Sequence, residues 1–105
     1  MDRRLKHLPY KGQFNQEYFD RLHFLNKEFL RLFWANNKYL RIVNKKSKLQ
    51  QIRELRVLGF FTSRNTIQLA EAGEYSCFSI TYLMGFADYW NLSLSDMLYK
   101  DFSKI

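Results

Sequence analysis

The C-terminal third of the chain contains the pattern that most limits its fold. Four apolar residues in it fall at i, i+3, i+4 and i+7 and so share one helical face: Ile80, Leu83, Met84 and Ala87. Asn91 is expected to end that helix. Ser93 and Asp96 form a capping box, in which each side chain satisfies a free backbone amide at the start of a second, short helix. The pattern thus predicts helices over roughly 79–90 and 94–100.

The composition is that of a small globular domain of 105 residues. A hydrophobic content of 47% excludes intrinsic disorder, and one Pro with four Gly argues against a strand-rich fold. No apolar run approaches the roughly 18 residues that span a bilayer, and no signal-peptide core is present. The lone Cys77 excludes an internal disulfide and a cysteine-based metal cage. We therefore expect a cytoplasmic protein with no membrane partner.

Positive charge is concentrated in one part of the chain. Residues 1–64 hold 15 of the 17 Lys and Arg residues with five acids, whereas residues 65–105 hold two Lys with five acids. A basic half can neutralise phosphates, which supply most of the sequence-independent affinity for nucleic acids. The alternatives are a solvated basic surface without a partner and a basic helix on an anionic membrane.

The N-terminal region divides into a basic arm and a helix. Pro9 and Gly12 interrupt any periodicity over residues 1–13, so we expect a flexible basic arm there. Asn15 is the expected N-cap of the helix that follows. Its apolar stripe steps by three or four residues: Phe14, Tyr18, Leu22, Leu25, Phe29 and Phe33. Further apolar residues widen this surface, so the helix is expected to pack in the core and could also serve a dimer.

The middle of the chain is expected to form three more helices. Asn36 and Asn37 compete for backbone hydrogen bonds, so a break there should separate an N-terminal extension, 14–36, from a helix over 38–43. Ser47 is the expected N-cap of a helix over 48–58 with a buried face of four residues: Leu49, Ile52, Leu55 and Leu58. Gly59 and Gly73 are expected to stop this helix and the next one, 63–72. The chain shows no convincing strand.

Residues 37–101 resemble the Cro/repressor-type (XRE) helix-turn-helix family. Residues 38–41 (Lys-Tyr-Leu-Arg) are similar to the first helix of that family, and the turn at 91–96 (Asn-Leu-Ser-Leu-Ser-Asp) is similar to its end. The recognition helix is matched at Ser63, Arg64, Thr66, Ile67, Glu71 and Gly73. The resemblance implies an all-α, lambda-repressor-like domain of five to six helices at 37–105, preceded by an extra N-terminal helix. It also implies a homodimeric transcriptional regulator that binds double-stranded DNA.

The same resemblance assigns the residues that would contact DNA. The helix at about 63–72 would enter the major groove, where Arg can bond guanine and Asn or Gln can bond adenine. The expected base contacts are Ser63, Arg64, Asn65 and Gln68. The expected phosphate contacts, which position the protein without reading sequence, are Arg41, Lys45, Lys46 and Lys48. Each could instead be an ordinary solvated or ion-paired surface residue. Ile67 and Ala70 should face the core, and Glu71 should bond within the fold.

Two departures from the family pattern favour a different function. The chain is about five residues longer between Ser47 and Ile67, which we place in the second helix and in the turn at 59–61. Glu74 follows Gly73, where the family commonly carries Lys or Arg. The alternative is therefore a protein-interaction module, built on a helix-turn-helix fold that has lost DNA binding.

Sequence features of an enzyme are missing. His7 and His23 are 16 residues apart without a neighbouring cysteine, and two ligands make a poor metal site. The chain has no glycine-rich phosphate loop and no Ser-His-Asp candidate. We expect no enzymatic activity, no metal and no cofactor. RNA binding by the basic half is a third possibility, although no RNA-binding motif is present.

Overall fold

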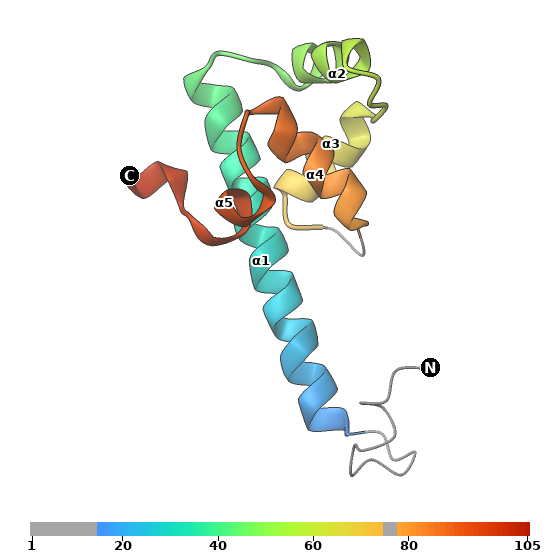
Figure 1. The fold of residues 1–105 in the computed structure, drawn as a ribbon, viewed down its shortest axis with the longest axis vertical. Coiled ribbons are helices and arrows are strands. Elements are labelled where there is room, and N and C mark those ends of the chain that lie inside the picture. Colours follow the sequence, from blue (N-terminus) through green and yellow to red (C-terminus); the bar gives the residue numbers. More distant parts are fainter. Residues whose placement is uncertain (1–14, 75–77) are drawn as a thin grey trace.

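The computed structural model describes residues 15–74 and 78–105, which form an all-α domain (Figure 1). Its elements are α1 (Gln16–Val43), α2 (Lys48–Val57), α3 (Arg64–Glu71), α4 (Ile80–Tyr89), α5 (Leu94–Tyr99) and the 3₁₀ helix η2 (Phe102–Lys104). Five helices and no strand among the described residues confirm the predicted all-α class. The predicted basic arm, 1–13, and Phe14 lie outside the described residues.

The helix starts follow from local capping chemistry. A side-chain oxygen accepts the backbone N–H three residues later at Asn15, Ser47 and Ser93, so the N-caps predicted at these residues are confirmed. Ser63 and Ser79 cap α3 and α4 in the same way. Each cap satisfies one of the amides that a helix start leaves without a partner.

The helix ends share one geometry. Four residues adopt left-handed backbone conformations directly after a helix: Lys45, Gly59, Gly73 and Asn91. The next residue then donates its N–H to a carbonyl five positions earlier, as Phe60 does to Leu55 at 2.9 Å. The predicted stops at Gly59, Gly73 and Asn91 are confirmed.

The predicted break at Asn36 and Asn37 is wrong, because α1 runs unbroken through both residues. Their side chains are buried and bond to other elements instead of competing for the α1 backbone. Asn36 Nδ2 donates to the carbonyls of Met97 (2.9 Å) and Lys100 (2.6 Å), and Asn36 Oδ1 accepts the Phe102 amide at 3.0 Å. Asn36 therefore attaches the C-terminal segment to α1, and residues 38–43 are the last turns of that helix.

The core lies between the C-terminal half of α1 and the four helices that follow it. Trp34 and Phe86 form its centre, with ring centroids 4.8 Å apart. The fully or nearly buried apolar side chains are Leu30, Phe33, Trp34, Ile52, Leu55, Ile67, Ala70, Leu83, Phe86, Ala87 and Met97. The inward orientation predicted for Ile67 and Ala70 is confirmed.

Two of the predicted buried faces need correction. Leu49, at the start of α2, is 48% exposed, and Leu58, its C-cap, is 64% exposed. Residues spaced by three are each turned about 60° from the one before, so the outer members of the series leave the buried face. On α4, Ile80 and Met84 are exposed while Phe86 is buried. The buried side of α4 is turned toward the large aromatic side chains that fill the core.

The N-terminal half of α1 extends away from the core (Figure 1). Every residue from 15 to 27 is exposed, and the first buried residue of the helix is Leu30. The predicted apolar stripe is therefore divided, since Tyr18, Leu22 and Leu25 remain 42–52% exposed while Phe33 is fully buried. The described helices include none that is long and apolar enough to cross a membrane.

Candidate nucleic-acid interface

A buried ion pair fastens α3 to α1. Arg41 Nη2 lies 2.5 Å from Glu71 Oε1, and Arg41 Nε donates to Glu71 Oε2 at 3.0 Å. Only 8% of the Arg41 side chain and 4% of the Glu71 side chain are exposed. Arg41 Nη1 also donates to the carbonyl of Lys46 at 3.1 Å, which anchors the turn between α1 and α2. The structural role predicted for Glu71 is confirmed.

Asn37 extends this network to α2 and to the end of α4. Its Nδ2 donates to Glu71 Oε2 (2.7 Å) and to Gln51 Oε1 (3.1 Å). Its Oδ1 accepts from Gln51 Nε2 (2.7 Å) and from Trp90 Nε1 (2.9 Å). The amide group thus uses all of its hydrogen-bonding capacity. A fully satisfied buried network of this kind holds the facing helices in one arrangement.

The other end of α3 is held by contacts to α4. Thr62, just before the Ser63 cap, hydrogen-bonds the hydroxyl of Tyr82, and burial raises the pKa of that tyrosine. Phe60 packs edge-on against Phe86, with centroids 5.5 Å apart, and over Gly85. The longer turn that the sequence indicated is therefore packed against the core at two points.

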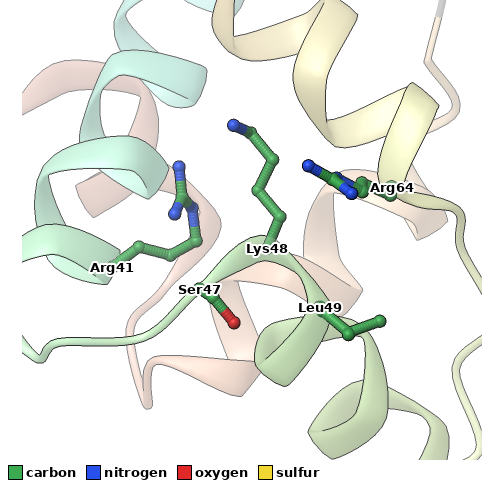
Figure 2. A pocket seen from close by; sticks show the side chains of 5 residues that line it. All are labelled: Arg41, Ser47, Lys48, Leu49 and Arg64. Carbon is green, nitrogen blue, oxygen red and sulfur yellow. The ribbon is translucent and has the colours of Figure 1, made fainter.

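An open, positively charged pocket lies between the end of α1 and the starts of α2 and α3. It occupies about 390 Å³ and is lined by Arg41, Ser47, Lys48, Leu49 and Arg64. Figure 2 shows the charged ends of Arg41, Lys48 and Arg64 extending into the same space, each from a different helix. Lys48 and Arg64 form no hydrogen bond or ion pair with another described side chain. Two positive charges and the two helix N-termini are thus available to an anion there.

The outer face of α3 continues from this pocket. Asn65 and Gln68 are exposed and, within the described part of the chain, their side chains have no hydrogen-bond partner. Arg64 and Gln68 are four residues apart and so lie on one face of the helix. A second open pocket joins Gln68 to Lys48 and Lys38. Lys38 was not among the DNA contacts predicted from the sequence, although it lies three residues before Arg41 on α1.

The structure brings only some of the predicted contacts together. Lys48, Arg64 and Gln68 share the two pockets, with Asn65 beside them. Arg41 contributes a wall of the first pocket, but its guanidinium is already bonded to Glu71. Ser63 uses its hydroxyl to cap α3 and also bonds Thr66 Oγ1 at 2.8 Å.

The two lysines of the preceding turn are in different environments. Lys45 is exposed with a φ of 56°. Lys46 Nζ is bound by both carboxylate oxygens of Glu54, at 2.7 and 2.9 Å, and lies 5.9 Å from the centre of the Tyr89 ring. Hydrogen bonds from Lys46 and Tyr89 lower the pKa of Glu54, while burial and this carboxylate raise the pKa of Tyr89. Lys46 is therefore engaged within the fold.

Comparison of the chain with protein-family models, with curated proteins and with solved structures gave no match. The resemblance to the Cro/repressor-type family therefore remains a prediction from the sequence. Any function has to be inferred from the geometry of α3 and the pocket beside it.

Proposed function

We propose that this protein is a DNA-binding transcriptional regulator that places the N-terminal half of α3 in the major groove. The observation that carries the proposal is the convergence of Lys48 and Arg64, both without side-chain partners among the described residues, at the starts of two successive helices (Figure 2). In helix-turn-helix proteins the second helix of such a pair contacts base edges while the first crosses the DNA backbone. α2 and α3 would fill these two places in a lambda-repressor-like domain.

The side chains on α3 suit this position chemically. Arg64 presents a forked donor that matches O6 and N7 of guanine. Asn65 and Gln68 can each pair with N6 and N7 of adenine. Their exposure means that binding DNA would cost no internal hydrogen bond.

Phosphate contacts are assigned to the basic surface around α3. Residues 38–64 contain eight Lys or Arg residues and a single Glu. Lys48 lines the same pocket as Arg64, with Lys45 on the adjoining turn and Lys38 in the second pocket. These cations would fix the position of α3 by binding backbone phosphates. Arg41 would act indirectly, by holding Glu71 and so the C-terminal end of α3.

The test is selection of bound sequences from a random DNA pool, followed by salt titration on the best site. Arg64→Ala should relax the preference at one base position, at a cost of about 1–3 kcal/mol. Lys48→Ala should weaken all sequences alike and reduce the salt slope by about one. Lys104→Ala is the matched control, because Lys104 is an exposed lysine on η2 and its loss should leave affinity nearly unchanged. Unaltered base preference in Arg64→Ala would contradict the proposal.

A second candidate function is protein binding through the turn between α2 and α3. Val57, Leu58 and Phe61 expose 64–87% of their surface there, which is unusual for apolar residues so close together. Pull-down with and without nuclease distinguishes the two functions. A complex that survives nuclease and is lost in Phe61→Ala would favour the interaction module. A complex lost on nuclease treatment and in Lys48→Ala would favour DNA.

A further inference from the structure

The first half of α1, residues 16–29, presents an apolar face outside the core and is called the arm below. Tyr18, Leu22, Leu25 and Phe29 follow one another at intervals of four, three and four residues. Two apolar residues in every seven is the spacing by which one helix packs along another. Tyr18, Leu22 and Leu25 are 52%, 45% and 42% exposed, so most of this face is not covered by the described part of the chain.

We propose that the arm pairs with the arm of a second copy of this chain, in antiparallel orientation. The apolar face is symmetric about the point between His23 and Phe24. When two arms run in opposite directions, Leu22 of each lies opposite Leu25 of the other. Tyr18 of each then lies opposite Phe29 of the other. A single register therefore places every apolar residue of the face opposite an apolar residue of the second copy.

Charges beside the apolar face favour this orientation. Arg21 and Glu28 are seven residues apart, and each directly precedes a residue of the face. Positions of this kind face each other across an antiparallel pair, so Arg21 of each copy would meet Glu28 of the other. In a parallel pair, Arg21 would instead face Asn26 and gain no opposite charge. Glu28 already pairs with Arg31 of its own helix at 3.1 Å, and in the antiparallel pair it would gain Arg21 of the other copy as a second cation. This added attraction favours an identical arm as the partner and favours the antiparallel direction.

The folded part of the chain extends the same face. Phe29 packs edge-on against Tyr99 of α5, with ring centroids 5.2 Å apart, and Tyr99 is 66% exposed. In the paired arrangement, Tyr18 of the second copy would reach this Phe29–Tyr99 surface at each end. The contact is isologous, because the same residues are used by both copies, and it therefore closes as a dimer.

The energetics of the arm also favour a partner. An isolated helix shorter than about 12–15 residues is marginal in water, and most helix stability in proteins comes from packing an apolar face. Among the described residues, the apolar side chains of Tyr18, Leu22 and Leu25 lack that degree of packing, since 42–52% of each stays exposed. Pairing two arms would bury the apolar face of both and stabilise this half of α1.

The test is sedimentation equilibrium of the full chain across the micromolar range, which requires no DNA and is independent of the proposed function. The wild type should be a dimer. Leu22→Asp with Leu25→Asp should raise the dissociation constant at least about a hundredfold, because charges replace the central apolar layers. These side chains lie outside the core, so circular dichroism should show the folded domain intact. Ile80→Asp with Met84→Asp is the matched control, since these side chains are 66% and 53% exposed on α4 and their replacement should leave the dimer unchanged.

Charge reversal tests the orientation. Arg21→Glu and Glu28→Arg should each weaken the dimer about tenfold by placing like charges opposite one another. The double variant should restore wild-type affinity, because positions 21 and 28 again carry opposite charges, with the acid and the base exchanged. A chain that stays monomeric, a dimer indifferent to the aspartates, or a double variant without recovery would overturn the proposal.

Discussion

Arg41 of α1 and Glu71 of α3 form a buried, bidentate ion pair across 30 residues of sequence, with atoms 2.5 and 3.0 Å apart. Through Asn37, the same carboxylate is linked to α2 and to the end of α4. The pair thus sets the position of the helix that carries the candidate DNA contacts. It also explains why Arg41 is not retained among the phosphate contacts.

Breaking this pair should strongly destabilise the fold. Glu71→Gln leaves the Arg41 guanidinium buried without a counter-charge, and such a loss typically costs about 3–5 kcal/mol. Urea unfolding followed by circular dichroism measures the change. Lys104→Ala removes only an exposed pair with Asp101, at 3.9 Å, and should change the stability by less than about 1 kcal/mol. Similar costs for the two variants would show that the buried pair contributes little.

Asn36→Ala should release the C-terminal segment from α1. The carbonyls of Met97 and Lys100 and the amide of Phe102 would lose their side-chain partner, at a cost of about 1–3 kcal/mol. Amide hydrogen exchange at Phe102 should accelerate more than exchange in α3. Asn65→Ala is the control, because Asn65 is exposed on α3. Unchanged protection at Phe102 would show that other contacts hold the segment.

Gly85→Ala should disturb the turn between α2 and α3. A Cβ at Gly85 would lie 2.3 Å from a ring carbon of Phe60, so the ring would have to move, at a cost of about 1–3 kcal/mol. The same substitution should cost less in a Phe60→Leu background, as a double-mutant cycle would measure. Gly73→Ala is the control. A Cβ at Gly73 would meet no neighbouring atom, but the φ of 85° there strains any residue other than glycine, and Phe60→Leu should not relieve that strain.

Stability should fall at both acidic and alkaline pH through Glu54 and Tyr89. The pKa of Glu54 is lowered from its ordinary value of 4.5, first by Lys46 and then by Tyr89. Its contribution is present above pH 4.5 and is lost as the pH falls through the folded-state pKa. The pKa of Tyr89 is raised from 10, chiefly by burial, so its contribution declines as the pH rises above 10. The melting temperatures of the wild type and Glu54→Gln should converge in acid, where Glu54 is protonated. Plots of melting temperature against pH that stay parallel for the two proteins would contradict this.

If both proposals hold, the affinity for DNA should vary periodically with the spacing between two half-sites. Each residue of an α-helix is turned by roughly 100° from the one before it. By this measure Asn37 and Arg41, which bond Glu71 of α3, lie on average about 100–110° around the α1 axis from the arm's apolar face. The two-fold axis of an antiparallel pair is perpendicular to the plane of its helices, so both α3 helices would lie on the same side. Affinity for two half-sites should therefore peak at separations of about 10–10.5 base pairs and its multiples. The Leu22→Asp, Leu25→Asp variant should bind all spacings alike.

The sequence predicted local features well and packing less well. Ser47, Ser93, Gly59 and Gly73 act on backbone groups within a few residues, so their roles could be read directly from the chain. The break at Asn36 was wrong because its partners lie more than 60 residues away, where no local pattern points to them. The sequence also did not show that Lys48 and Arg64 line one pocket, because their proximity depends on how α2 and α3 pack against each other.

The amino-acid sequence by itself determined that the chain is helical, where most helices begin and end, and which part is basic. These properties depend on capping groups, left-handed residues and composition, all of which are local. Only the tertiary structure decided which apolar faces are buried, that Arg41 and Lys46 are engaged within the fold, and that the described part of the chain leaves most of the arm's apolar face exposed. Burial and pairing depend on partners distant in the sequence, and their positions follow from the packing of all the helices together.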